Sequence, residues 1–181
     1  YASVFGELDS YRDIVAPGAF AASLAQYKAD DRSPPCLWQH DPKKPIGIYP
    51  SLVEDAKGLN VTGALNLAVQ QGAEAYALLK QGALTGLSIG YETVTQTWDE
   101  KNLITTLEVI DLWEISLVTF PAGPTARVQS VKSFADMMRL ADVEDYLRET
   151  HGLSQKEACT LVSTVKRVAM APSDSEELRR K

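Results

Sequence analysis

The pattern of hydrophobic and polar positions divides the chain near residue 130. Before that point, short apolar or alternating runs are separated by turns rich in Pro, Gly, Asp and Asn, which is typical of strands. After it, apolar residues recur every three or four positions, which is typical of amphipathic helices. The pattern predicts an α+β domain at residues 1–130, a helical pair at residues 131–171 and a charged tail at residues 172–181.

The first part is expected to hold about seven strands. Residues 46–53 and 59–65 flank a charged turn and are typical of a β-hairpin. Two longer β-rich runs, residues 88–98 and 103–119, surround a second turn, and the second run ends at the Pro-rich segment 121–124. The other elements expected here are strands at residues 1–6 and 36–40, helices at residues 20–27 and 69–80, and a loop at residues 9–18.

The helical part has the outline of a helix-turn-helix. A first helix is predicted from residue 133 to about residue 150, Gly152 breaks it, and Ser154 with Glu157 forms the capping box of a second helix. A helix-turn-helix that binds DNA carries a basic face. Residues 132–181 hold nine basic and nine acidic residues. We therefore expect a packing or docking arm, with DNA binding as the alternative.

The overall charge narrows the classes of partner. The 181 residues contain 18 Lys and Arg against 24 Asp and Glu, a formal net charge of −6. An acidic balance argues against a nucleic-acid coat and against a polybasic membrane binder. No apolar run approaches the roughly 20 residues of a membrane span, and no signal peptide is visible. Because residue 1 is Tyr, we expect either that the natural start has been trimmed or that position 1 is an artificial boundary. Neither nucleic acid nor a membrane is expected as a partner.

Cysteines and histidines are scarce, which limits the available chemistry. Cys36 and Cys159 form neither a metal-binding spacing nor a disulfide framework, so we expect both to be reduced. His40 and His151 are the two histidines, which nearly excludes a multi-histidine zinc site, and no metal is expected. His151 precedes Gly152 at a predicted helix end, where a structural role is expected.

The sharpest local motif is the segment 86–90, which matches G-x-S-x-G. This is the nucleophile-elbow pattern, but an elbow needs a strand before the serine and a helix after it. Here a helix precedes the motif and a strand follows it. One interpretation is a strand entry whose glycines allow a close approach. In the other, Gly86 and Gly90 leave room for a substrate backbone beside a nucleophilic Ser88.

His40 is the candidate base for such a nucleophile. A serine becomes reactive when a base accepts its proton, and histidine is the usual base. His40 is expected at the end of the strand 36–40, immediately before Asp41 and Pro42. Its alternative role is that of a lone histidine satisfied by a local hydrogen bond.

Glu114 is the candidate third group. A carboxylate inside an apolar run costs free energy unless it is paired, and such groups are often functional. In a regular strand, Leu112, Glu114 and Ser116 share one face and Asp111 lies on the other. Asp111 is the competing acid, since a bulge would change the faces. The alternative for Glu114 is an edge strand with its carboxylate in water.

Five groups of short motifs follow one another between residue 1 and about residue 128. In chain order these motifs are Pro17-Gly18-Ala19-Phe20, Gln39-His40-Asp41 followed by Pro45-Ile46-Gly47, Glu54-Asp55 before Gly58-Leu59, Gly86-Leu87-Ser88-Ile89-Gly90-Tyr91, and Glu114-Ile115-Ser116-Leu117-Val118-Thr119 before Pro121-Ala122. Each motif is weak alone, but the ordered set is specific. In this set the chain resembles the HK97-type prohead maturation proteases of tailed bacteriophages.

The resemblance implies a fold and a site. The fold is that of the herpesvirus assemblins, a mostly antiparallel β-barrel surrounded by helices, and the activity is that of a serine endopeptidase. Ser88 matches the family's nucleophile and His40 its base. Assemblins carry a second histidine as third member, whereas Glu114 is the natural occupant of that place here. The backbone N–H groups of the turn Ala122-Gly123 are the candidate oxyanion donors.

The resemblance also implies partners and a location. The substrates would be the scaffold protein, the major capsid protein and the enzyme itself, inside the prohead in the bacterial host cytoplasm. No cofactor is needed for this chemistry. Herpesvirus relatives pair through a helix, so whether this chain forms a homodimer is open. The rival function is a non-enzymatic capsid-assembly or scaffolding module with the same fold.

Overall fold

The computed structural model describes residues 1–132 and 140–169. The chain divides into two compact units, Tyr1–Val131 and Lys132–Lys181. The start of the first C-terminal helix predicted at residue 133 and the predicted tail at residues 172–181 both lie outside the described residues. Among the helices that are described, none combines the length and the apolar character needed to cross a bilayer.

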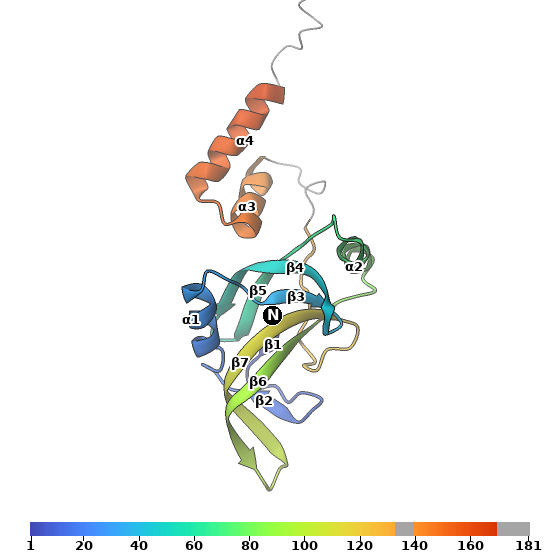
Figure 1. Cartoon of the computed structure of the whole chain (residues 1–181), viewed down its shortest axis with the longest axis vertical. Coiled ribbons are helices and arrows are strands. Elements are labelled where there is room, and N and C mark those ends of the chain that lie inside the picture. Colours follow the sequence, from blue (N-terminus) through green and yellow to red (C-terminus); the bar gives the residue numbers. More distant parts are fainter. Residues whose placement is uncertain (133–139, 170–181) are drawn as a thin grey trace, which may run out of the picture. The chain divides into compact units, whose positions relative to one another are not determined.

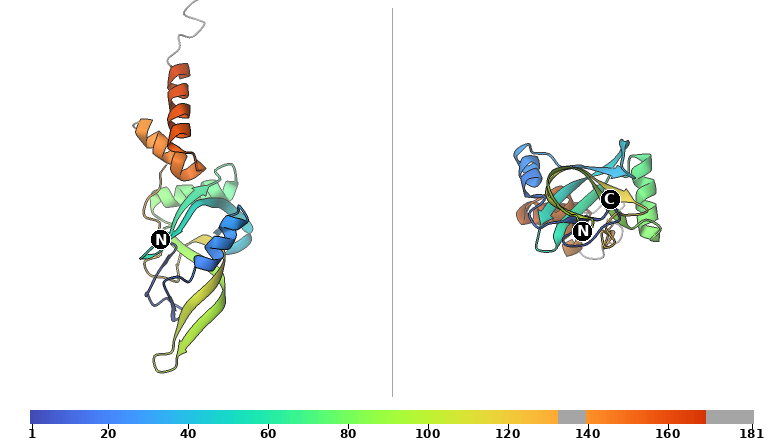
Figure 2. Two further views of the ribbon diagram at one scale, coloured as in Figure 1. Left: turned by 90° about the vertical axis from the view of Figure 1, so that its left-hand side faces the viewer. Right: turned by 90° about the horizontal axis from the view of Figure 1, so that it is seen from below.

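One sheet forms the framework of the first unit, which is an α+β fold (Figure 1). The sheet curls into a nearly closed barrel (Figure 2). Its strand order is β1–β5–β4–β3–β7–β2, and β6 pairs with β7 as well. The seven strands found in residues 1–132 are β1 (Ser3–Val4), β2 (Asp13–Val15), β3 (Pro35–Trp38), β4 (Asp41–Glu54), β5 (Gly58–Leu65), β6 (Gly86–Asp99) and β7 (Ile104–Val118).

The sheet is mixed, which corrects the prediction of a mostly antiparallel barrel. β7 pairs antiparallel with β6 but parallel with both β2 and β3. A short turn between two strand-like runs indicates an antiparallel hairpin, whereas a pairing between strands far apart in sequence leaves no local signal. β2 was itself missed, because its three half-buried residues show no alternation within the segment 9–18 that we expected to be a loop.

Two helices lie on opposite sides of the barrel (Figure 2). They are α1 (Ala21–Ala29) and α2 (Gln70–Gln81), so both predicted helices of this part are confirmed. α1 is tied to the middle of β7. The Ser23 hydroxyl accepts a hydrogen bond from the Leu112 amide at 3.0 Å, and the Tyr27 hydroxyl donates to the Leu112 carbonyl at 2.9 Å. These bonds hold β7 firmly just before its buried end.

A bulge in β7 decides which of its side chains enter the core. Gly90 pairs with Glu114 while Tyr91 pairs with Leu112, so Trp113 is an extra residue. The bulge reverses the alternation of faces. Leu112 therefore joins Ile115 and Leu117 in the hydrophobic core. The prediction that Leu112 shares a face with Glu114 is wrong for this reason.

In residues 140–169, the described part of the second unit, there are two helices, α3 (Leu140–His151) and α4 (Gln155–Ala169). The predicted capping box is confirmed: the Ser154 amide donates to the Glu157 carboxylate at 2.8 Å, and the Glu157 amide donates to the Ser154 hydroxyl at 3.3 Å. Ala158 and Val162 on α4 are buried. Gly152, with a φ of +65°, ends α3.

Candidate active site

His40 lies in a two-residue turn rather than at the end of a strand. Trp38 pairs with Asp41, so Gln39 and His40 make the whole connection between β3 and β4. Both have positive φ, 51° and 59°. This is the turn geometry that normally selects Asn and Gly. For other residues it costs on the order of 1–3 kcal/mol each, and it persists only where the surroundings impose it. The strand predicted at residues 36–40 therefore ends two residues early.

Contacts with the C-terminal end of β7 and with the residue after it impose this turn. The Gln39 amide donates to the Leu117 carbonyl at 3.0 Å. The Gln39 side chain donates to the Thr119 hydroxyl at 2.9 Å and accepts from the Thr119 amide at 3.3 Å. The His40 amide donates to the Ser116 hydroxyl at 3.0 Å. Four hydrogen bonds thus fix the backbone that carries the imidazole.

The imidazole of His40 is paired with a buried carboxylate. Its Nδ1 lies 2.5 Å from Glu114 Oε1. The other oxygen, Oε2, accepts from the Ser116 hydroxyl at 2.6 Å. Glu114 is 9% exposed, so its carboxylate does not lie in water at an edge strand. The hydrogen bond to the Glu114 carboxylate raises the pKa of His40 above its ordinary 6.5, while partial burial of the ring acts in the opposite direction.

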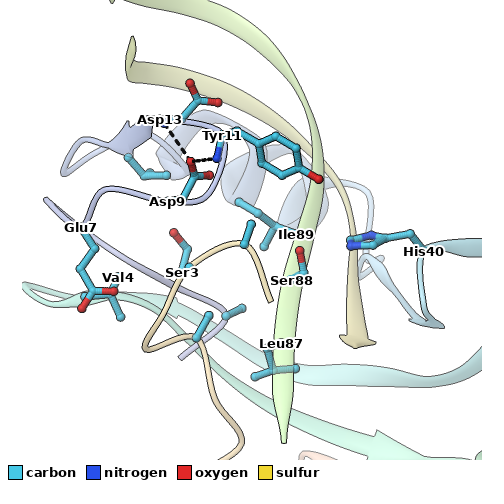
Figure 3. Close-up of a pocket in the computed structure, with 15 residues that line it drawn as sticks. Ser3, Val4, Glu7, Asp9, Tyr11, Asp13, His40, Leu87, Ser88 and Ile89 are labelled. Atoms are coloured by element: carbon cyan, nitrogen blue, oxygen red, sulfur yellow. Dashed lines mark hydrogen bonds between the residues drawn. The ribbon is translucent and has the colours of Figure 1, made fainter. Parts of the chain in front are cut away.

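Ser88 lies on β6, directly opposite Ser116 on β7. β7 runs between β3 and β6, so the His40 turn and Ser88 flank the same stretch of β7. Ser88 is 8% exposed, and it lines one pocket of about 290 Å³ together with His40. Figure 3 shows both side chains among those that line that pocket.

The glycines around Ser88 face β7 rather than open space. A Cβ on Gly90 would lie 2.4 Å from Glu114 Oε1, and a Cβ on Gly86 would lie 2.5 Å from the Val118 carbonyl. A side chain at position 86 would collide with the backbone, and one at position 90 would force the Glu114 carboxylate to move. The expectation that these glycines leave room for a substrate backbone is therefore not what the geometry shows. Gly90 leaves room for the carboxylate that contacts His40.

The turn after β7 lines the same pocket. Ala122 and Gly123 are among the lining residues. Their carbonyls are engaged, since Ala122 accepts from the Ser10 amide at 3.1 Å and Gly123 from the Ala126 amide at 3.2 Å. Within residues 1–132, no hydrogen bond donated by either of their own amides is found.

Sequence reasoning missed the contribution of the N-terminal segment to this pocket. Glu7, Asp9, Tyr11 and Asp13 all line it (Figure 3). Asp9 accepts from the amides of Tyr11 and Asp13, both at 2.8 Å. This local turn is the signal that an Asp-rich segment offers, but it marks a turn and says nothing about which pocket the turn borders.

Asp111, the competing acid, is not part of this group. It is exposed, and its carboxylate lies 3.4 Å from the Ser23 hydroxyl of α1 and 3.3 Å from the Trp113 ring nitrogen. The fold brings Ser88, His40 and the turn 122–123 to one pocket, with Glu114 bonded to His40. Across the described ranges, no three His, Cys, Asp or Glu residues are grouped to hold a metal ion.

Serine hydrolases use the same three groups, a serine hydroxyl, an imidazole and a carboxylate bonded to that imidazole. A family model described as caudovirus prohead serine protease matches residues 1–140, and the chain belongs to this family. The resemblance inferred from the ordered motifs is thereby confirmed.

The chain is similar to three known phage proteins, and each match covers a different share of the relative's length. The chain is 33% identical to the prohead protease of Enterobacteria phage HK97, over 97% of this chain and 78% of that protein. It is 28% identical to the prohead protease of Escherichia phage T5, over 69% of this chain and 58% of that protein. It is 31% identical to a capsid polyprotein of Pseudomonas phage PAJU2, over 74% of this chain and 20% of the polyprotein.

Proposed function

We propose that this chain is a serine endopeptidase that cleaves capsid and scaffold proteins during phage prohead maturation. The observation that carries the proposal is the hydrogen bond between the buried Glu114 carboxylate and the partly exposed His40 ring, with 2.5 Å between Oε1 and Nδ1, beside the pocket that Ser88 lines. A buried carboxylate bonded to one imidazole nitrogen leaves the other nitrogen free to act as a base. Membership of a serine protease family supports the same chemistry.

The proposed reaction begins with proton transfer. Glu114 accepts the Nδ1–H of His40, which leaves Nε2 as the basic nitrogen. Nε2 takes the Ser88 proton as Oγ attacks the peptide carbonyl, and Glu114 stabilises the imidazolium that forms. His40 then protonates the leaving amine. Water hydrolyses the acyl-enzyme in a second round in which His40 again serves as base and acid.

The amides of Ala122 and Gly123 are the proposed oxyanion donors. They belong to the turn that lines the pocket with Ser88, and no hydrogen bond from them is found within residues 1–132. Backbone donors that need no reorganisation are suited to a developing oxyanion, and the loss of one such donor typically costs about 3–4 kcal/mol.

The proposed substrates are the major capsid protein, the scaffold protein and the enzyme's own chain. Two relatives are named prohead proteases and a third a capsid polyprotein, and these names support capsid proteins as the substrate class. The proposed place of action is the interior of the prohead in the host cytoplasm. A homodimer is the alternative to a monomeric enzyme.

Mass spectrometry of cleavage products tests the proposal. The full chain is incubated with the capsid and scaffold proteins of its own phage, beside Ser88→Ala and Ser51→Ala. Ser51 lies on β4 and is not among the residues that line the pocket, so it is the matched control. We expect new termini with the wild type and Ser51→Ala, and none with Ser88→Ala. Intact substrates in all three reactions would favour the non-enzymatic capsid-assembly module instead.

A further inference from the structure

We infer that Ser116 is a positioning residue that locks the Glu114 carboxylate and the His40 backbone into one arrangement. The inference rests on the proposed function, because it concerns the same site. Ser116 does not touch a substrate: it is fully buried, with 0% of its surface exposed. Its role would be exerted through its two neighbours.

The direction of the hydrogen bonds at Ser116 follows from the chemistry of its partners. An amide can only donate, so the Ser116 oxygen accepts from the His40 N–H at 3.0 Å. The single hydroxyl hydrogen then goes to Glu114 Oε2 at 2.6 Å. The carboxylate receives bonds at both oxygens, from Ser116 at Oε2 and from His40 at Oε1. It cannot rotate about its last bond without losing both.

The same hydroxyl restrains the other partner of the pair. His40 has a φ of 59°, a left-handed conformation that costs a non-glycine residue free energy. The Ser116 oxygen binds the amide of that very residue. One atom therefore acts on both sides of the His40–Glu114 hydrogen bond.

A purely structural role would not require a hydroxyl at this position. The neighbouring residues of β7 are Ile115, Leu117 and Val118, and all are buried. A buried hydroxyl costs free energy unless both its donor and its acceptor are used. Ser116 and Glu114 are the two polar exceptions in this buried stretch of β7, and they are bonded to each other.

The pKa of His40 can be measured by NMR. If Ser116 had only a structural role, replacing it would not lower this pKa. The chain has two histidines, and a His151→Gln variant assigns their resonances. The ionisable groups around the pair are Glu114 on β7, bonded to the ring, the pocket-lining Glu7, Asp9, Tyr11 and Asp13, and Cys36 and Tyr49, which feel the Glu114 charge. Ser116→Ala changes none of these charges. Loss of the Ser116 donor alone would make the carboxylate a stronger acceptor and raise the pKa of His40, so a fall in this pKa would report a changed His40–Glu114 geometry.

The test compares Ser116→Ala with the wild type, with Ser116→Thr and with Ser23→Ala. Ser116→Thr keeps the hydroxyl. Ser23 is the matched control, since it is another buried serine whose hydroxyl accepts from a β7 amide, at 3.0 Å, outside the site. We expect the pKa of His40 to fall toward 6.5 in Ser116→Ala and to stay at the wild-type value in Ser116→Thr and Ser23→Ala.

Activity provides the second readout. We expect Ser116→Ala to lose about 10- to 100-fold in kcat at neutral pH, as displaced catalytic groups do, and the acid limb of its kcat/KM profile to move to lower pH. The inference is overturned if the pKa of His40 in Ser116→Ala is the same as in the wild type or higher, or if Ser23→Ala lowers this pKa by as much as Ser116→Ala does. The titration needs no catalysis, so it is independent of the proposed function, which fails instead if the wild type cleaves nothing.

Discussion

Two hydroxyl–carboxylate hydrogen bonds, one at each end of the β6–β7 pair, have nearly the same length. Ser116 donates to Glu114 at 2.6 Å where the strands are buried, and Thr97 donates to Glu108 at 2.5 Å where they are exposed. The ladder between the two strands runs from Gly86–Val118 to Asp99–Ile104. Its outer end projects beyond the rest of the sheet (Figure 1).

The two bonds differ in what surrounds them. At the outer end water replaces a lost partner, so an exposed hydrogen bond to a carboxylate contributes little to stability. At the inner end an unpaired polar group costs about 1–3 kcal/mol. The buried bond therefore selects one arrangement of its partners, and the exposed bond does not. Burial of a polar network, more than its bond lengths, distinguishes the candidate site from the rest of this ladder.

Ser88→Ala gives the largest expected difference between the two ends. We expect a loss of activity on the order of 10⁴-fold or more, as for other serine nucleophiles, with the fold retained. Thr97→Ala at the outer end should leave cleavage rates unchanged. Cleavage rates and circular dichroism of both variants check this. Equal activities in the two variants would remove the distinction that we draw between the ends.

Glu114→Gln comes next. We expect kcat/KM to fall by about 10²- to 10⁴-fold, because the amide favours the wrong histidine tautomer. The base must be neutral, so wild-type activity should be lost as the pH falls through the raised pKa of His40, above 6.5. In Glu114→Gln this limb should move to lower pH. A pH–rate series of each enzyme measures both effects.

Two matched variants accompany Glu114→Gln. Glu108→Gln changes an exposed carboxylate on the same strand and should behave like the wild type. Asp111→Asn tests the competing acid. If Asp111→Asn is inactive while Glu114→Gln is fully active, the third role belongs to Asp111.

Gly90→Ala has a smaller expected effect. Its Cβ would lie 2.4 Å from Glu114 Oε1 and 2.9 Å from Glu114 Cγ, so the carboxylate has to move. We expect kcat to drop about 10- to 100-fold through this displacement. In a Glu114→Ala background the same glycine substitution should cost little, since coupled changes are not additive. Steady-state kinetics of the four enzymes measures the coupling, and fully additive effects would contradict the account.

Thr97→Val has the smallest expected effect. The substitution removes the exposed bond to Glu108, and we expect the free energy of unfolding to change by less than about 0.5 kcal/mol. Urea denaturation measures it. A loss of about 1–3 kcal/mol, the cost of an unpaired buried polar group, would mean that burial does not separate the two bonds.

The elements that depend on local hydrophobic pattern could be predicted from the sequence. The β4–β5 hairpin, the β6–β7 pair, α1 and α2 follow from apolar spacing and from Gly and Pro at their ends. Glu114 was recognisable because a carboxylate inside an apolar run requires a partner, and the structure supplies one in His40. The ordered motifs were sufficient to identify the family.

Non-local features were out of reach of the sequence pattern. The parallel pairings of β7 join distant segments, and the bulge at Trp113 reverses the faces of the strand. The turn at Gln39 and His40 runs against local preference and is imposed by bonds from β7 and Thr119. Ser116 lies in an apolar run that gives no hint of its two polar partners.

Labelling with a serine-reactive phosphonate tests the central claim most directly, since such a reagent reports an activated hydroxyl. Peptide mapping of the treated full chain should find one adduct, on Ser88. The adduct should be absent in Ser88→Ala, strongly reduced in His40→Ala and unchanged in His151→Gln. An adduct on a different serine, or labelling of His40→Ala at the wild-type rate, would contradict the assignment of nucleophile and base.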